Sequence, residues 1–231
     1  MIPEIIYQDK NILVINKPSG FLVHGAPHMK LPHGPTLVDW LKKEFPQTTS
    51  VGDDPEYRPG IVHRLDKDTS GVMIIALNQG TFLFLKQCFK DRKIKKSYGA
   101  IVKGAMKETK GTIEAPIGVK AGTVKRTTHG GKDTKEAVTN YCVEKTFEKN
   151  GQVYTLVSVF PLTGRTHQIR VHLNSIHHPI VGDQMYGGKE NARLAPRLML
   201  HAFALEVPTQ EGIKRFEAPL PDEFIDFMPR V

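Results

Sequence analysis

The sequence contains few cysteines and no long hydrophobic run. Its 231 residues include two cysteines, Cys88 and Cys142, and neither belongs to a Cys-x-x-Cys pair. That number is too small for a disulfide framework, so we expect both to be small apolar residues in a reducing compartment. No apolar stretch approaches the roughly 20 residues that a membrane-spanning helix needs. The first ten residues also lack the segments of a signal peptide, which predicts a cytoplasmic protein with no membrane partner.

Internal repeats and a regular alternation of strands and helices are also missing. Short apolar segments with strand character occur at 4–17, 71–77, 97–104, 138–147, 154–160 and 198–208. Helical spacing of apolar residues occurs at 36–45, where Thr36 and Asp39 form a capping box, and at 82–96 and 165–176. Residues 111–131 are expected to be a basic loop. This order excludes a doubly wound parallel sheet and predicts an α+β domain on a mixed, mainly antiparallel sheet.

Positive charge is in excess: 32 Lys and Arg face 24 Asp and Glu, for a net charge of +8. Such an excess favours an anionic partner, of which nucleic acid is the commonest, although a basic enzyme without such a partner is an alternative. The charge is concentrated in two segments, at 86–96 and at 120–135. Both segments could bind along a phosphate backbone. Alternatively, the first is a solvated helix face and the second is a disordered loop.

Two motifs bring charged side chains to the ends of predicted core elements. In HRLDKDTSG, Asp66 lies where a loop enters a buried strand, and is either a structural cap, which position alone favours, or a reactive carboxylate. In GRTHQIR, Arg165 and His167 lie at a predicted helix start, where a cation opposes the helix dipole. We therefore expect an anion there, either a phosphate or a carboxylate such as Asp66, unless the arginine is simply solvated. His167 and His172 are not spaced as a zinc pair, which argues against a metal site.

Taken in order, the motifs resemble those of the RluA-type pseudouridine synthases. The segments INKPSGFLVH, GIVHRLDKDTSGVMIIA, DRKIKKSYGAIVKG, LTGRTHQIRVHL, HPIVGDQMYGG and LMLHAFALEVP carry the resemblance, which extends from about Tyr7 to Pro221. Members of this family isomerise uridines in structured RNA without a cofactor or metal. The resemblance implies a mainly antiparallel central sheet with flanking helices and a central RNA-binding cleft.

The resemblance also assigns roles to individual residues. It makes Asp66 the catalytic aspartate and Arg64 the arginine that enters the RNA helix where the target base leaves. Tyr98 would pack on the uracil, Arg165 would pair with the catalytic carboxylate, and Ile169 would line the pocket. His63 and Leu65 are assigned to the same substrate-binding set. The residues expected to contact RNA are Lys96, Lys93, Arg92, Lys125, Arg126, His167 and Arg170.

Several expectations concern the protein as a whole. We expect a single catalytic domain over 1–231 without the S4-type RNA-binding domain of many relatives, and a monomer. The motifs favour large-subunit ribosomal RNA as substrate, with transfer RNA as the other candidate. Two rival functions are a catalytically silent RNA-binding module and a retaining glycoside-cleaving enzyme. The second would need another acid paired with Asp66, and Asp68 is expected to serve the turn instead.

Overall fold

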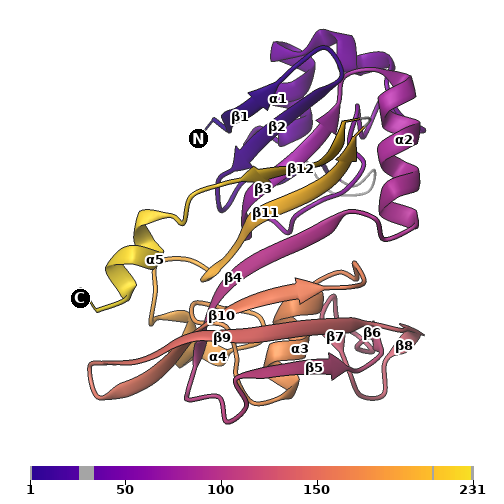
Figure 1. The fold of residues 1–231 in the computed structure, drawn as a ribbon. Helices are drawn as coiled ribbons and strands as arrows, with labels where there is room; N and C mark the ends of the chain where they lie inside the picture. The colour runs from indigo at the N-terminus through magenta and orange to yellow at the C-terminus, as the bar shows by residue number, and fades with distance from the viewer. Residues whose placement is uncertain (1, 26–33, 210, 230–231) are drawn as a thin grey trace. The chain divides into compact units, whose positions relative to one another are not determined.

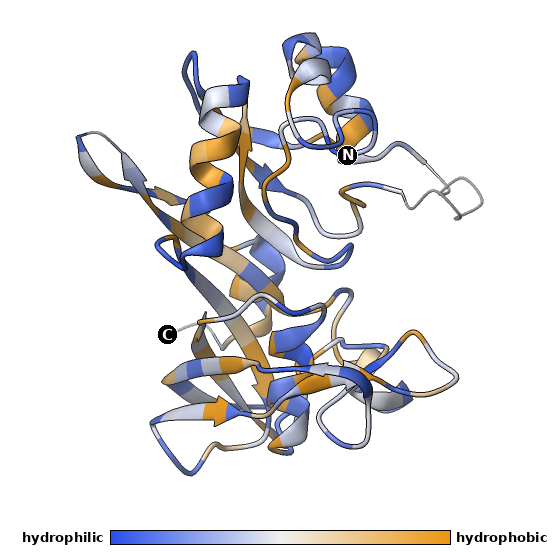
Figure 2. Ribbon diagram, turned by 90° about the vertical axis from the view of Figure 1, so that its right-hand side faces the viewer, coloured by the Kyte–Doolittle hydropathy of each residue, from blue (hydrophilic) through white to orange (hydrophobic). Residues whose placement is uncertain are grey.

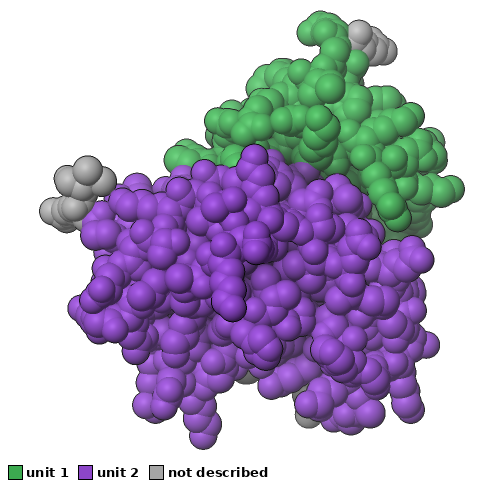
Figure 3. Space-filling view, turned by 60° about the horizontal axis from the view of Figure 1, so that its bottom comes forward, with its two compact units in different colours: residues 1–95, 202–219 green, residues 96–201, 220–231 purple. Residues whose placement is uncertain are grey.

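A computed structural model describes residues 2–25, 34–209 and 211–229 of the chain (Figure 1). The chain divides into two compact units, each made of two separate segments (Figure 3). The first unit contains residues 1–95 and 202–219, and the second contains residues 96–201 and 220–231. The prediction of a single catalytic domain over 1–231 stays a prediction.

The first unit is a sheet covered by helices. Its strands are β1 (Glu4–Gln8), β2 (Ile12–Lys17), β3 (Ser70–Ala76), β11 (Leu200–Thr209) and β12 (Gly212–Glu217). They follow the order β1-β2-β3-β11, with β12 also paired to β11. Antiparallel pairing joins β1 to β2, β2 to β3 and β11 to β12. The unit also contains α1 (Leu37–Glu44), a short 3-10 helix (Pro46–Ser50) and α2 (Gln79–Lys90).

Hydrophobic patterning explains how these elements pack. Every residue of β3 is buried, as its continuous apolar sequence predicts. Phe82 and Leu85 of α2 pack in one cluster with alternate β3 residues, and the polar residues of α2 face outward, so colours alternate along the helix (Figure 2). The capping box of α1 is confirmed, because Thr36 and Asp39 exchange side chain to backbone hydrogen bonds.

The second unit holds two sheets. The larger has the order β4-β10-β9-β5, formed by β4 (Lys95–Lys103), β10 (Gln152–Pro161), β9 (Val138–Lys149) and β5 (Lys110–Glu114). Its pairings are antiparallel. The smaller has the order β7-β6-β8, formed by β7 (Arg126–Thr127), β6 (Ile117–Val119) and β8 (Lys132–Lys135). The helices are α3 (Gln168–Ser175), α4 (Gly188–Ala192) and α5 (Asp222–Phe227).

The expected α+β class with a mainly antiparallel sheet is confirmed, and three local expectations are wrong. The helical pattern at 82–96 extends too far, because α2 ends at Lys90 and β4 begins at Lys95. Residues 111–131, predicted as a loop, contribute most of β5 and all of β6 and β7. The helix predicted from Arg165 begins instead at Gln168, and His167 before it has a left-handed backbone with a φ of 57°. Among the described residues, no helix has the length and apolar character needed to cross a bilayer.

Candidate active site

The loop that carries Asp66 is fixed at both ends by glycines. Gly60 and Gly71 have φ values of +66° and +119°, which favour glycine. A Cβ atom at Gly60 would lie 2.2 Å from the carbonyl oxygen of Ala76, and one at Gly71 would lie 2.1 Å from that of Ala202. A side chain at either position would therefore force the backbones apart. The loop thus has a defined start and end on the sheet of the first unit.

Two side chains hold the middle of this loop, one from the last residue of β2 and one from just after it. The ammonium group of Lys17 is fully buried and donates to the carbonyl oxygens of Pro18, Phe21 and Lys67 at 2.8, 2.9 and 3.1 Å. The Ser19 hydroxyl donates to the Asp68 carbonyl oxygen at 2.7 Å. Lys67 and Asp68 directly follow Asp66, so the backbone is held just after the residue that carries this half-buried side chain.

The neighbours of Arg64 have structural contacts within the first unit. The backbone N–H of Ile74 donates to Nε2 of His63 at 3.0 Å, and the His63 ring stacks on Phe89 with centroids 4.7 Å apart. Leu65 is buried in the core. His63 therefore pins the loop to β3 and α2, while its assignment, and that of Leu65, to substrate binding stays a prediction.

Arg64 is exposed, but a buried histidine holds its guanidinium. Its Nη1 lies 3.2 Å from Nε2 of His24, and Nδ1 of His24 lies 2.9 Å from the Gly25 carbonyl oxygen. A carbonyl oxygen can only accept, so Nδ1 carries the proton and Nε2 accepts from Arg64. Burial lowers the pKa of His24 below 6.5, and the charges of Arg64 and Arg58 lower it further. The imidazole is therefore neutral at physiological pH.

In the second unit, the start of β4 and the GRTHQ turn meet. Lys96 and Tyr98 lie two residues apart on β4 and so share one face of the strand. The ammonium group of Lys96 donates to the Thr163 carbonyl oxygen at 3.3 Å, two residues before Arg165. Tyr98 is half-buried, pairs with Val159 of β10 and packs on the apolar cluster that contains Ile169. The structure thus brings together the predicted residues Lys96, Tyr98 and Ile169 and the turn that carries Arg165.

A buried glutamine fixes the turn that carries Arg165. Oε1 of Gln168 accepts from the Thr163 hydroxyl at 2.7 Å and from the backbone N–H of Arg165 at 3.0 Å. Its Nε2 donates to the Val138 carbonyl oxygen at 3.0 Å and to the Thr139 hydroxyl at 2.9 Å. All four hydrogen-bonding positions of the amide are used. The half-buried Arg165 side chain itself donates from Nε to the Glu136 carbonyl oxygen at 3.0 Å.

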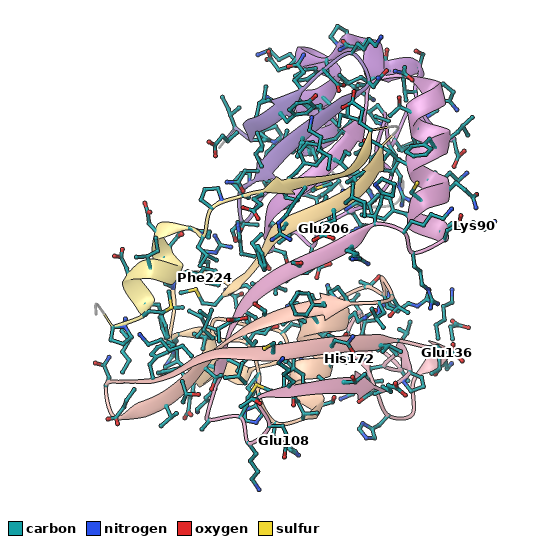
Figure 4. All side chains as sticks on the ribbon, viewed as in Figure 1. Lys90, Glu108, Glu136, His172, Glu206 and Phe224 are labelled. Atoms are coloured by element: carbon teal, nitrogen blue, oxygen red, sulfur yellow. The ribbon has the colours of Figure 1, made fainter. Side chains whose placement is uncertain are left out.

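The same network continues to a fully buried histidine, His172 on α3 (Figure 4). Its Nε2 lies 2.9 Å from the Ala115 carbonyl oxygen, so it carries the proton, and its Nδ1 accepts from the Thr139 hydroxyl at 2.8 Å. Burial lowers the pKa of His172 below 6.5. The neutral ring therefore has a structural partner on each side and links α3 to β9 and to the segment before β6.

Arg170 corrects one sequence-based prediction. It was expected to contact RNA, but its side chain is 5% exposed and forms two hydrogen bonds with Asp183, at 2.8 and 2.9 Å. Burial by itself would raise the pKa of Asp183, but Arg170 and the backbone N–H groups of Tyr186 and Met185 outweigh it and lower that pKa below 3.8. Because its guanidinium is held inside the second unit, Arg170 acts as a structural residue.

The other residues expected to contact RNA are at least partly accessible. Arg92 and Lys93 are exposed just after α2, and Lys93 has an ion pair with Asp91 at 3.4 Å. Exposed pairs of this kind contribute about 0–1 kcal/mol, so Lys93 can exchange Asp91 for a phosphate at little cost. In the second unit, Lys125 is exposed, and Arg126 and His167 are half-buried.

Several residues that shape the site had no role in the sequence-based reasoning: His24, Lys17, Gln168, Asp183 and Tyr186. The signal available for Lys17 was a cation at the end of an otherwise apolar strand. The signal available for Gln168 and Asp183 was their place within the motifs GRTHQIR and HPIVGDQMYGG. Over residues 2–25, 34–209 and 211–229, no group of three or more His, Cys, Asp or Glu side chains could hold a metal ion.

Comparison with known proteins gives a consistent result. The family model described as RNA pseudouridylate synthase matches residues 11–175, more than half of the chain. The chain is 39% identical over 226 residues to the ribosomal large subunit pseudouridine synthase D of Borreliella burgdorferi, covering 97% of this chain and 67% of that protein. It is 38% identical over 237 residues to the protein of the same name from Pseudomonas aeruginosa, covering 96% and 69%.

A solved structure agrees with these sequences. Human RNA pseudouridylate synthase domain containing 1 matches with a TM-score of 0.77 and 31% identity, over 94% of this chain and 83% of that one. Across the curated relatives compared, the chain spans 57% to 72% of their lengths. The chain therefore belongs to the RNA pseudouridylate synthase family, as an RluA-type member whose reaction isomerises uridine to pseudouridine in RNA.

Proposed function

We propose that Asp66 is the catalytic group and that this chain modifies large-subunit ribosomal RNA. The observation that carries the first part is the loop from Gly60 to Gly71. It bears the family motif, is fixed at both ends, and is held next to Asp66 by Lys17 and Ser19. A carboxylate that must meet one sugar carbon needs such a rigid support, because a displacement of about 1 Å can cost 100-fold in rate.

The reaction breaks the bond between C1′ and N1 of the uridine and forms a bond between C1′ and C5. An ionised Asp66 can attack C1′, or can remove a proton from the sugar and so produce a glycal. In either route the detached uracil turns and is attached again through C5. The proton lost from C5 is balanced by the proton gained at N1, so no cofactor or metal is required. Only one carboxylate is needed, which separates this proposal from a retaining glycosidase.

The remaining groups have roles in handling the base and the RNA backbone. Arg64 would fill the gap that the extruded uridine leaves, which offsets part of an unstacking cost of a few kcal/mol. Tyr98 would pack on the uracil, Ile169 would line the apolar side of the pocket, and Arg165 would provide positive charge for the carboxylate. The exposed Arg92 and Lys93 and the accessible Lys96, Lys125 and Arg126 would contact phosphates.

The choice of ribosomal RNA rests on relatives. The proteins from B. burgdorferi and P. aeruginosa are both named as ribosomal large subunit enzymes. We also propose that the protein is a monomer and that it works in the cytoplasm. The two free cysteines, Cys88 and Cys142, support the second of these, because a reducing compartment keeps thiols unpaired.

The substrate can be tested with the purified chain. It is incubated separately with a large-subunit ribosomal RNA transcript and with unmodified transfer RNA transcripts, and pseudouridine is mapped by its specific chemical adduct. We expect product at discrete positions of the ribosomal transcript, and none with an Asp66→Ala variant. Product in transfer RNA alone would contradict the ribosomal assignment. Release of free uracil from either RNA would support the glycosidase instead.

A second prediction concerns the contact between Arg64 and His24. Because the Arg64 charge contributes to lowering the pKa of His24, Arg64→Gln should raise that pKa. The fold favours the neutral form of His24. Its contribution to the free energy of unfolding is therefore present above about pH 6.5, near the unfolded pKa, and is lost as the pH falls through the lower pKa of the folded protein. Titration of the His24 ring by NMR measures this directly. Lys67→Gln, which removes an exposed cation from the same loop, is the control. An unchanged His24 titration in Arg64→Gln would show that the contact is absent in solution.

A further inference from the structure

The small sheet β7-β6-β8 is a strongly basic element with little core of its own. Between residues 117 and 135 it has five Lys and Arg against a single Asp, a net charge of +4. Ile117 is its one buried hydrophobic strand residue, in a cluster with Ala137 and Val171. Small sheets without a substantial hydrophobic face are marginally stable by themselves. The position of this sheet therefore depends on contacts with the rest of the second unit.

One tyrosine supplies such contacts from outside the sheet. The hydroxyl of Tyr186 accepts from the backbone N–H of Arg126 in β7 at 2.9 Å, and it lies 2.8 Å from Nδ1 of His167. Tyr186 also packs against the cluster that contains Ile117. Its phenol oxygen can accept from Arg126 and donate to His167 at the same time. A single oxygen atom therefore connects β7 to His167, the residue just before α3.

The tyrosine is itself held in place by buried groups. Its backbone N–H donates to Oδ1 of Asp183 at 3.0 Å, and the Arg170 guanidinium lies over its ring, 5.2 Å from the centroid. Its ring meets the His167 ring edge to face, with centroids 5.7 Å apart. The buried ion pair of Arg170 and Asp183 thus supports Tyr186. A second hydrogen bond also joins the small sheet to this segment, because the Lys125 ammonium group donates to the Met185 carbonyl oxygen at 2.9 Å.

We propose that Tyr186 is a positioning residue that docks the basic sheet on the start of α3, and so preorganises a phosphate-binding surface for RNA. Lys120, Lys125, Lys132 and Lys135 are exposed on this sheet and its connections. Chain segments ordered before RNA arrives do not lose conformational freedom on binding, which raises affinity. The inference rests on the proposed function, because it assumes that these lysines contact RNA.

The test is the Tyr186→Phe variant of the whole chain, which removes one oxygen atom. Affinity for a fluorescein-labelled RNA hairpin, measured by anisotropy, should fall about threefold to tenfold, the effect of one lost hydrogen bond. KM for the RNA should rise while kcat changes little, and the Arg126 amide should exchange its hydrogen faster. Tyr154→Phe is the matched control, because its hydroxyl also has a hydrogen bond in the second unit, to Gln152 at 3.0 Å. It should leave RNA affinity unchanged.

Two lysine substitutions separate failure of the inference from failure of the proposed function. Lys120→Gln with Lys132→Gln should weaken RNA binding and reduce its salt dependence, since each phosphate contact contributes to the slope. If this pair weakens binding but Tyr186→Phe binds like the unmodified protein, the positioning role is refuted and the surface assignment stands. If the lysine pair has no effect on binding, the surface assignment is refuted, and the inference with it.

Discussion

Replacing Asp66 by Asn should reduce the rate of pseudouridine formation by a factor of about 10³ to 10⁶, the range found when a reacting side chain is removed from an enzyme. Asn has nearly the same shape, and the backbone hydrogen bond from Thr69 to the Asp66 carbonyl oxygen, at 3.2 Å, is unaffected by the change. The lost function is the negative charge, which both possible routes require. Single-turnover assays measure the effect. They start from the RNA that contains the target uridine, and chemical mapping then detects the pseudouridine formed.

The control for this variant lies two residues away. Asp68 is exposed, and its backbone carbonyl, rather than its side chain, receives the Ser19 hydroxyl. Asp68→Asn should therefore leave the unfolding free energy within about 0.5 kcal/mol of the original value. The activation free energy of the reaction should change by no more than the same amount. Asp66→Asn should still bind RNA, because the basic surfaces are intact. Full activity in Asp66→Asn would contradict the proposed mechanism and would favour the alternative that Asp66 is a structural cap.

Replacing Asp183 by Asn should have the largest effect on stability, about 3–5 kcal/mol of unfolding free energy, because it leaves the buried Arg170 charge without its partner. Urea denaturation measures the loss. The matched control is Asp53→Asn, which breaks an ion pair with Lys86 that has a similar length, 2.7 Å, but is exposed to solvent. Exposed pairs contribute about 0–1 kcal/mol, so the contrast isolates the effect of burial.

The same pair predicts how stability depends on pH. The folded pKa of Asp183 is lowered, so its contribution is present above about pH 4, near the unfolded pKa, and is lost as the pH falls through the folded value. The stability difference between the original protein and Asp183→Asn should therefore shrink in acid. If Asp183→Asn does not fold, a double variant that replaces Arg170 by Met and Asp183 by Leu should regain most of the stability. Equal effects for Asp183→Asn and Asp53→Asn would contradict the prediction.

The elements that the sequence predicted well are those with local signals. The capping box at Thr36, the apolar run of β3 and the apolar stripe of α2 depend on neighbouring residues, and all are present. The small basic sheet was missed because its strands have two to four residues, and its Lys and Gly content is typical of loops. Its structure depends on Tyr186, 60 residues from Arg126.

The candidate site was predictable to a similar extent. The motifs single out Asp66, Arg64, Tyr98 and Arg165 as candidates, because each lies in a long and specific segment, and their roles stay predictions. The same motifs placed Arg170 at the surface, because sequence does not show that Asp183 lies beside it in the interior. The hydrogen bonds of Lys17, His24 and Gln168 were not predictable from sequence. Most of their partners are backbone carbonyl groups, which every residue type carries, and several of the partners are distant along the chain.

The division of the first unit into residues 1–95 and 202–219 has a consequence during protein synthesis. The ribosome makes the Asp66 loop early. β11, the neighbour of β3 and the strand against which Gly71 packs, begins only at Leu200, at the end of the intervening segment. Until then β3 is an open sheet edge with an apolar sequence, the kind of surface that pairs with other chains. A nascent chain stalled before residue 202 should thus require chaperone protection and be inactive, although it already contains Asp66.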